Sequence, residues 1–296
     1  MDLEPQPRVS SKRTTSEEDE TLIPVGSALS GERKVRFSRL LTSRVYDLAD
    51  KSLGILGIVL FFLIWEVASR THILNPFYFP PFSQIIGKGV ELVTSGAIWE
   101  HMIFSLTNFS VGFAVSVAVG VLAGIPMGWY KGLSKTLDPL LSGVYATPLI
   151  ALLPLIIMLF GLGAVSKIIM TFLAAVFPML INTMVGIANT DTNLIKMSRS
   201  FGATDATIFL KVSVPGSLPY IVAGMRVALG RALVYIVVAE QYGAAMGLGY
   251  LSSVAAQRFQ IAAMFVPIVM IAGLGAVLTE LLKAVERRLE TWRPQK

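Results

Sequence analysis

Six stretches of this chain are each long enough and apolar enough to cross a lipid bilayer as a helix. A spanning helix needs about 20 predominantly apolar residues. The stretches cover approximately residues 53–69, 103–130, 137–160, 166–187, 216–239 and 261–285. Of the 296 residues, 54% are hydrophobic and only 15% are charged, whereas soluble domains carry about 25% charged residues. The sequence therefore predicts an all-α integral membrane protein with six transmembrane helices.

Two polar regions flank the predicted membrane domain, which covers residues 46–290. Residues 1–45 mix Pro, Ser, Thr and both signs of charge with few large apolar side chains. Such a segment cannot bury enough surface to offset the entropy lost on ordering. We expect a disordered cytoplasmic tail over 1–45 and a short cytoplasmic end over 291–296. Between the first two spans, residues 81–93 are expected to form a short helix at the membrane interface.

The distribution of basic residues indicates the orientation of the chain. If the N-terminal tail is cytoplasmic, 19 of the 25 Lys and Arg residues lie in cytoplasmic segments and four in outer segments. Cytoplasmic loops of membrane proteins carry such an excess, so both termini are expected in the cytoplasm. The excess also accounts for the net charge of +6 without nucleic acid as a partner. With no cysteine and only two histidines, the chain offers no disulfide framework and no cluster typical of a metal site.

Glycines and prolines within the spans indicate close helix packing and an irregular third span. Gly120, Gly124 and Gly128 recur every four residues and so share one helix face. Small residues at this spacing let two helix backbones approach closely. Pro148 and Pro154 interrupt the third span. In lipid, such a break persists only where it is buried in protein or lines a cavity, which favours a transporter over a simple membrane anchor.

A polar segment, residues 190–215, separates the fourth and fifth spans. Its apolar residues recur at roughly helical spacing up to Phe201, Gly202 breaks the pattern, and a second amphipathic stretch ends at Pro215. The pattern predicts a helix, a glycine turn and a second helix on the cytoplasmic side. Because a structured loop of this kind presents a surface, we expect it to contact a partner.

The segment MSRSFGATDATIFLKVSVP resembles the signature loop of ABC-importer permeases. In that family Glu-Ala-Ala is followed, after three residues, by Gly and, after nine more, by Ile-x-Leu-Pro. The corresponding positions here are Lys196, Met197, Ser198, Gly202, Val212, Val214 and Pro215. The spacing, Gly202 and Pro215 match the motif, whereas Lys196 replaces its acid. The following LPYIVAGMRVALGRALVYIVVAE is similar to the subgroup that imports nitrate, alkanesulfonates, taurine or bicarbonate.

The resemblance implies a type I ABC-importer permease fold with a cytoplasmic coupling helix that docks on an ATPase subunit. The residues implied in coupling are Lys196, Met197, Ser198, Phe201, Gly202, Ala203, Thr204, Phe209 and Pro215. The implied partners are two ATPase subunits that hold ATP and Mg²⁺, a second permease copy (identical or a close paralogue) and an extracytoplasmic solute-binding protein, at the bacterial inner membrane. The chain itself is expected to be a translocation subunit that binds no cofactor and is not an enzyme. Residues 161–168 come nearest to a phosphate-binding loop but lack its second glycine and its Ser or Thr.

Ionisable residues within spans are costly in lipid and therefore mark candidate pathway positions. Arg226 and Arg231 lie in the fifth span, where each either attracts an anionic solute or serves a structural role. Tyr235, at i+4, is placed to stack on Arg231. Glu240 ends the same helix and is either a partner for a basic group or a plain interfacial carboxylate. Asn182 either contacts solute or joins two helices by a hydrogen bond.

We therefore expect the membrane subunit of an ATP-driven importer that works by alternating access, for a small anion such as nitrate, a sulfonate or taurine, or bicarbonate. Three alternatives stay open. One is a secondary transporter driven by an ion gradient, although no internal repeat and no intramembrane Asp is present. The second is an importer of an uncharged heterocyclic or aromatic nutrient. The third is a membrane scaffold without a pathway.

Overall fold

The computed structural model describes residues 53, 54 and 56–289, so the predicted tail over 1–45 and the end over 291–296 lie outside the described residues. The chain divides into one unit that ends at Leu63 and a second unit that begins at Ile64. In the first unit the described residues are helical, as expected for the first predicted span. Everything below concerns the second unit.

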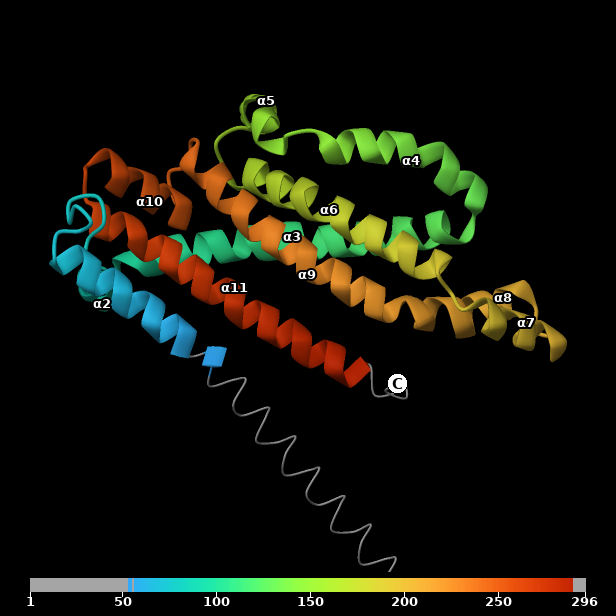
Figure 1. The fold of residues 1–296 in the computed structure, drawn as a ribbon. Coiled ribbons are helices and arrows are strands. Elements are labelled where there is room, and N and C mark those ends of the chain that lie inside the picture. Colours follow the sequence, from blue (N-terminus) through green and yellow to red (C-terminus); the bar gives the residue numbers. More distant parts are fainter. Residues whose placement is uncertain (1–52, 55, 290–296) are drawn as a thin grey trace, which may run out of the picture. The chain divides into compact units, whose positions relative to one another are not determined.

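The second unit is helical, and its described residues contain no strand. Residues 64–70 are helical and lead through an irregular segment to the next helix (Figure 1). The α-helices are α2 (Phe82–Thr94), α3 (Ala97–Trp129), α4 (Lys131–Ala146), α5 (Leu153–Phe160), α6 (Ala164–Ala188), α7 (Thr192–Ser200), α8 (Asp205–Ile208), α9 (Val214–Gln241), α10 (Leu248–Gln257) and α11 (Ile261–Leu289). A 3-10 turn, Leu149–Leu152, precedes α5, and a π-helical turn, Phe209–Ser213, joins α8 to α9.

Four helices among the described residues are long and apolar enough to cross a membrane. They cover Ala97–Trp129, Ala164–Ala188, Asp205–Gln241 and Ile261–Arg288. These coincide with the second, fourth, fifth and sixth predicted spans. The short helix predicted over residues 81–93 is confirmed as α2.

The third predicted span, residues 137–160, is not one straight helix. It consists of α4 and of the segment Leu149–Phe160, which meet at an angle of 79°. Thr147, directly before Pro148, has an extended backbone (φ −70°, ψ 131°) because the proline ring disfavours a helical residue before it. Pro154 lies in the first turn of α5, where a missing N–H costs nothing. The predicted irregularity is therefore confirmed, but the break is at Pro148 alone.

The core of the unit lies where α6 packs against both α3 and α9. Phe109 of α3, Met179 of α6 and Leu229 of α9 are buried together there. The three predicted packing glycines line the α3 side of this contact. A Cβ at Gly124 would lie 2.7 Å from Thr183 Cβ, one at Gly128 would lie 2.6 Å from Ile187 Cβ, and one at Gly120 would collide with Met179. Larger residues at these positions would force the two helices apart.

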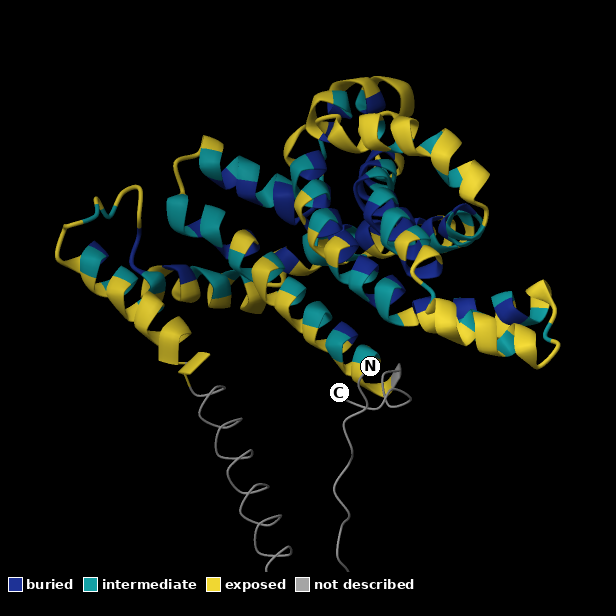
Figure 2. Cartoon of the chain, turned by 45° about the vertical axis from the view of Figure 1, so that its right-hand side comes forward, coloured by how far each residue is buried: buried dark blue, intermediate teal, exposed yellow. Residues whose placement is uncertain are grey.

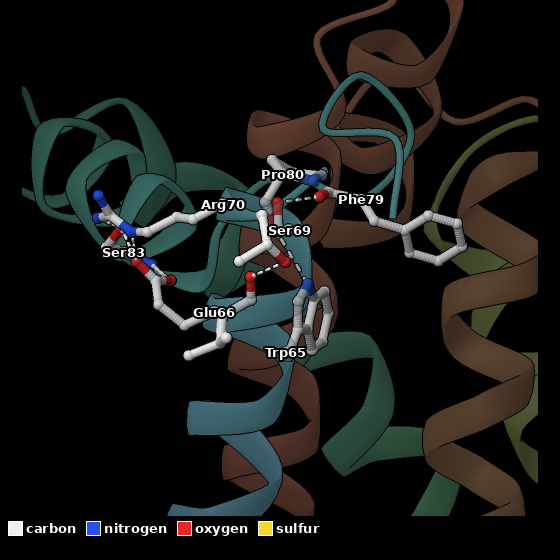
Figure 3. Close-up of polar contacts among 9 residues, drawn as sticks. Trp65, Glu66, Ser69, Arg70, Phe79, Pro80 and Ser83 are labelled. Carbon is white, nitrogen blue, oxygen red and sulfur yellow. Dashed lines mark hydrogen bonds and ion pairs between the residues drawn. The ribbon is translucent and has the colours of Figure 1, made fainter. Parts of the chain in front are cut away.

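At the end of the bundle remote from α7 and α8, side chains of residues 64–70 fasten the segment before α2 (Figure 3). Trp65 Nε1 donates to Pro80 O at 3.2 Å, and the buried Ser69 hydroxyl donates to Phe79 O at 2.6 Å. Glu66, near the end of the first predicted span, accepts from the Ser83 backbone N–H at 3.0 Å and pairs with Arg70. Its carboxylate thus satisfies a free donor in the first turn of α2.

Candidate functional site

The loop between α6 and α9 folds into two helices whose starts are each fixed by local hydrogen bonds. Asp191 caps α7, with its Oδ1 accepting from the Asn193 N–H at 2.8 Å. Thr204 caps α8, with its hydroxyl oxygen accepting from the Thr207 N–H at 3.3 Å. Side chains of this type at an N-cap satisfy helix donors that otherwise lack partners. The starts of both loop helices are therefore fixed by residues of the loop itself.

The turn between α7 and α8 is centred on Gly202. Its φ of +76° lies in the left-handed region, which residues with a Cβ rarely adopt. The Gly202 N–H donates to Arg199 O at 2.9 Å, and the Ala203 N–H donates to Ser198 O at 3.0 Å. This pair of bonds around a left-handed glycine is the Schellman C-cap. An exposed ion pair between Arg199 and Asp205, at 3.0 Å, crosses the same turn.

The second loop helix continues into the fifth span. Helix α8, the π-helical turn and α9 form one run, Asp205–Gln241, and Pro215 lies in the first turn of α9. Ile208 is buried, and Phe209 packs edge-on against Trp129 with ring centroids 5.0 Å apart. Helix α8 is therefore continuous with the span that α9 forms.

The loop leaves large apolar side chains uncovered (Figure 2). Phe201 at the turn is 84% exposed, and Met197 and Leu194 on α7 are also exposed. Contiguous exposed apolar groups on a polar segment mark an interaction site. Lys196 is exposed on the same helix. Among the predicted coupling residues, Phe209 differs from the rest, because its ring faces Trp129 and anchors the loop.

Arg226 on α9 forms an ion pair with Glu286 on α11. The sequence left two roles open for Arg226, attraction of an anionic solute or a structural role. Its carboxylate partner within the chain favours the structural role. The pair links two helices that also pack against each other.

Arg231 lies one and a half turns further along α9 and stacks on an aromatic ring, although not on the expected one. Its guanidinium carbon lies 4.4 Å from the ring centroid of Tyr145 on α4. Tyr235 instead packs against the apolar cluster that includes Leu153 and Met170. No carboxylate lies within ion-pair distance of Arg231 in the part of the chain that the structure describes. Arg231 is therefore a half-buried cation with no carboxylate partner among the described residues.

The remaining predicted pathway residues do not converge on Arg231. The Asn182 amide donates to Pro178 O at 2.8 Å, and its Cβ lies against Gly224 in the α6–α9 contact. Glu240 is fully buried at the opposite end of α9 from the loop. At 1.5 Å per residue, Arg226 and Glu240 are about 21 Å apart along the helix. Arg226, Arg231 and Glu240 therefore lie at different levels along α9, and the five residues do not form one cluster.

The sequence of residues 116–291 matches the family described as the binding-protein-dependent transport system inner membrane component. The match covers more than half of the chain, including the loop and both arginines. The chain belongs to this family. It is an ABC transporter permease, a translocating subunit of the inner membrane, and the predicted resemblance is confirmed.

Curated relatives of this permease include several sulfur-compound transporters. The putative aliphatic sulfonates transport permease of Escherichia coli (strain K12) is 35% identical over 78% of this chain and 88% of its own length. The taurine transport system permease of the same strain is 30% identical over 81% and 89%. A formylaminopyrimidine transport permease of Halalkalibacterium halodurans is 32% identical over 79% and 94%.

Solved ABC transporter structures share the permease's fold. A chain of the MetNI methionine transporter in an inward-facing conformation aligns with a TM-score of 0.53 and 22% identity, over 65% of this chain and 94% of that one. A chain of an amino acid ABC transporter with histidines aligns with a TM-score of 0.50 and 20% identity, over 67% and 97%. The predicted all-helical fold of an ABC-importer permease is therefore confirmed.

A buried polar cluster surrounds Glu240, and sequence reasoning missed it. The backbone N–H groups of residues 247–249, at the start of α10, donate in turn to His101 Nδ1 at 3.1 Å, Ser105 Oγ at 2.8 Å and Glu240 Oε2 at 2.8 Å. A Cβ at residue 247 would collide with the Glu240 carboxylate. The carboxylate therefore fixes the loop between α9 and α10 to the bundle. The glycines at positions 243, 247 and 249, which follow Glu240 closely in the sequence, could have indicated that this loop packs against the carboxylate.

Lys167, which the basic-residue count placed in an outer segment, is also fully buried. Its Nζ donates to Leu162 O at 2.6 Å and to Gly243 O and Ser166 Oγ, both at 3.3 Å. Gly243 belongs to the loop between α9 and α10, and Glu240 binds the Gly249 N–H where the same loop joins α10. Lys167 and Glu240 therefore fasten one loop and form one structural cluster.

Proposed function

We propose that this permease is the membrane subunit of an ATP-driven importer that moves a small anion by alternating access. In this proposal it has six transmembrane helices with both termini in the cytoplasm, and α7, the turn and α8 form the coupling element. ATP and Mg²⁺ bind to two separate ATPase subunits, each docked on one such loop. An extracytoplasmic binding protein delivers the solute.

The observation that carries the proposal is the combination of local rigidity and apolar exposure in the loop. Caps at Asp191 and Thr204 and the turn at Gly202 fix its shape. The uncovered Phe201 supplies an anchor suited to a hydrophobic groove. Because α8 continues directly into α9, movement of the ATPase groove would be transmitted to the membrane-spanning part of α9. A plain connector needs none of these features.

An anionic solute is supported by Arg231 and by the relatives. Arg231 is half-buried within a spanning helix and has no carboxylate partner among the described residues, and its stacking on Tyr145 holds it in one orientation. A cation in such surroundings attracts an anion more strongly than it would in water. Two relatives are permeases for aliphatic sulfonates and taurine. A sulfonate, or another small anion such as nitrate or bicarbonate, suits this site.

A second permease copy is supported by the exposure of α4 and α5. Helix α4 buries none of its residues within the chain. The large apolar side chains left uncovered on α4, the 3-10 turn and α5 include Leu140, Ile150, Leu155, Met158 and Phe160. A two-fold pair, homodimeric or with a close paralogue, would cover this face with an equivalent surface. Lipid would cover the remaining apolar surface.

One relative favours a second candidate solute. The formylaminopyrimidine permease indicates that this group of sequences also includes importers of heterocyclic nutrients. In that case Arg231 would bind a ring by stacking together with Tyr145, without requiring a negative charge on the solute.

The test is uptake into proteoliposomes that contain the permease with its ATPase. We expect uptake of a labelled sulfonate, such as taurine, to require ATP on the ATPase side and the binding protein on the other side. Uptake driven by a proton or sodium gradient without ATP would contradict the proposal. Uptake of formylaminopyrimidine that excess sulfonate does not inhibit would favour the second candidate.

A further inference from the structure

A pocket of about 320 Å³ lies at the end of the bundle that carries α7 and α8. It opens between the end of α3, the first turn of α4, the end of α6 and the first turn of α7. Its volume falls within the range of small-ligand sites, roughly 300–1,000 Å³. Of the segment that resembles the family's signature loop, only Ser213, at the unspecified position of its Ile-x-Leu-Pro, lines this pocket, and the pocket is distinct from the Arg231 site.

The pocket carries positive charge without a matching carboxylate. Lys131 and Lys135 are exposed at its rim and have no ion pair among the described residues. Helix α4 starts at Lys131 and has no side-chain cap, so its first backbone N–H groups remain available to an acceptor. The positive end of this 16-residue helix favours an anion at the same place. No Asp or Glu is among the residues that line the pocket, and Asp191, next in the chain to Thr190 and Thr192 of its wall, is engaged as the cap of α7.

A second, independent observation points to a ligand. Ser213 borders the pocket, is fully buried, and its hydroxyl has no hydrogen-bond partner in the part of the chain that the structure describes. An unpaired buried hydroxyl is uncommon and costs about 1–3 kcal/mol unless something binds it. Ser213 ends the π-helical turn, and such turns occur frequently at functional sites.

The surroundings indicate what kind of anion fits. Trp129, at the end of the apolar α3, and Lys131, directly after it, form the Trp-then-Lys pattern of a cytoplasmic headgroup level. Trp129, Ile187 and Ile195 make part of the wall apolar. Basic pockets between spanning helices on the cytoplasmic side bind anionic lipid headgroups. A free phosphate ion would leave this apolar wall without a partner.

We propose that this pocket binds the phosphate group of an anionic phospholipid, with Lys131, Lys135 and the first turn of α4 around the phosphate and Ser213 donating its hydroxyl. The bound headgroup would join α4, the end of α6 and the start of α7, and would thereby brace the loop against the bundle. The proposal stands independently of the transported solute and of ATP coupling, because it concerns binding alone.

The test measures lipid binding to the purified full chain by native mass spectrometry, with phosphatidylglycerol as the probe and phosphatidylcholine of the same acyl chains as the control lipid. We expect the native chain to retain one phosphatidylglycerol in preference to phosphatidylcholine. In the double variant Lys131→Gln, Lys135→Gln, affinity for phosphatidylglycerol should fall at least about tenfold, which corresponds to about 1.4 kcal/mol. The matched control, Lys196→Gln with Lys211→Gln, removes the same charge from exposed positions outside the pocket and should bind as the native chain does.

The variant Ser213→Ala separates binding from folding. Because its hydroxyl has no partner among the described residues, we expect an unchanged or higher melting temperature without lipid but a weaker stabilisation by phosphatidylglycerol. Equal phosphatidylglycerol binding by the double variant and its matched control would overturn the proposal. So would displacement of the lipid by inorganic phosphate at equal concentration, since the site would then be one for a free anion. If the double variant does not purify, Lys135→Gln against Lys211→Gln gives the same comparison.

Discussion

Replacing Gly202 by valine is expected to reduce ATP-dependent uptake at least tenfold while the helices of the bundle stay folded. A β-branched residue at φ +76° costs on the order of 1–2 kcal/mol or more. The turn would open, the two bonds of the C-cap would be lost, and Phe201 would leave its fixed position. We expect ATP hydrolysis by the complex to lose its dependence on solute, or the ATPase to dissociate. Uptake and hydrolysis measured on the same proteoliposomes distinguish these outcomes from simple loss of protein.

Two control variants test whether the effect of Gly202→Val comes from the left-handed backbone at this position. Gly202→Asn places a residue that tolerates the left-handed region at the same position and should retain most uptake. Gly216→Val, on α9, has open space around the position and no positive φ, so it should behave as the native chain. Normal coupled uptake by Gly202→Val would show that the shape of the turn does not matter for coupling.

Replacing Arg231 by leucine is expected to lower uptake of an anionic solute by roughly 10- to 150-fold. A hydrogen bond from a charged group to its partner contributes about 1.5–3 kcal/mol, and leucine removes it while keeping the apolar volume. The effect should appear with the complex still assembled and with ATP hydrolysis still present. Arg231→Lys keeps the charge but loses the planar stacking on Tyr145 and should retain an intermediate rate.

Arg226, which is ion-paired within the chain, is the control for the Arg231 prediction. Arg226→Leu leaves Glu286 without its partner, so it should lower thermal stability more than it lowers the apparent affinity for solute. If Arg231→Leu transports an anion at the native rate, Arg231 has no part in the pathway and a purely structural role remains. If only anions are affected and a heterocyclic solute is not, the charge itself is what the solute contacts.

The spans and the loop were accessible from the sequence because both depend on local pattern. Hydropathy predicted α3, α6, α9 and α11, because a spanning helix satisfies its own backbone and needs only apolar side chains. The turn at Gly202 was likewise predictable, since a glycine between two amphipathic stretches can adopt the left-handed conformation that a tight turn requires. The spacing of Gly202 and Pro215 in this loop was also sufficient to identify the family.

The misses concern features that depend on packing between distant segments. The position of the break in the third span could be read from Pro148, but the 79° bend could not, because it depends on how α5 packs against α6. Arg231 finds Tyr145 on another helix, a contact that spacing along α9 cannot reveal. Helix α10 was also missed, because its ten residues are too few for a span and show only a weak amphipathic pattern.

Burial of charge was the least predictable property. Lys167 appeared to be one more basic residue outside the membrane, yet it is fully buried and is satisfied by backbone carbonyls. Glu240 shares this cluster, and its role follows from the glycines of a loop that folds back over it. Composition shows that a charge is present, but only the tertiary fold shows whether water reaches it.

The most direct test of the coupling account is a cross-link from the turn to the ATPase. Because the chain contains no cysteine, Phe201→Cys introduces a single thiol at the most exposed large apolar residue of the loop, and a short thiol-to-amine cross-linker can report its neighbour in the assembled complex. The matched control is Phe259→Cys, a position that is 72% exposed between α10 and α11; these two helices meet at the end of the bundle opposite α7 and α8 (Figure 1). We predict a cross-linked product with the ATPase subunit from Phe201→Cys and none from Phe259→Cys. An ATPase cross-link from Phe259→Cys but none from Phe201→Cys would contradict both the docking surface and the orientation of the chain.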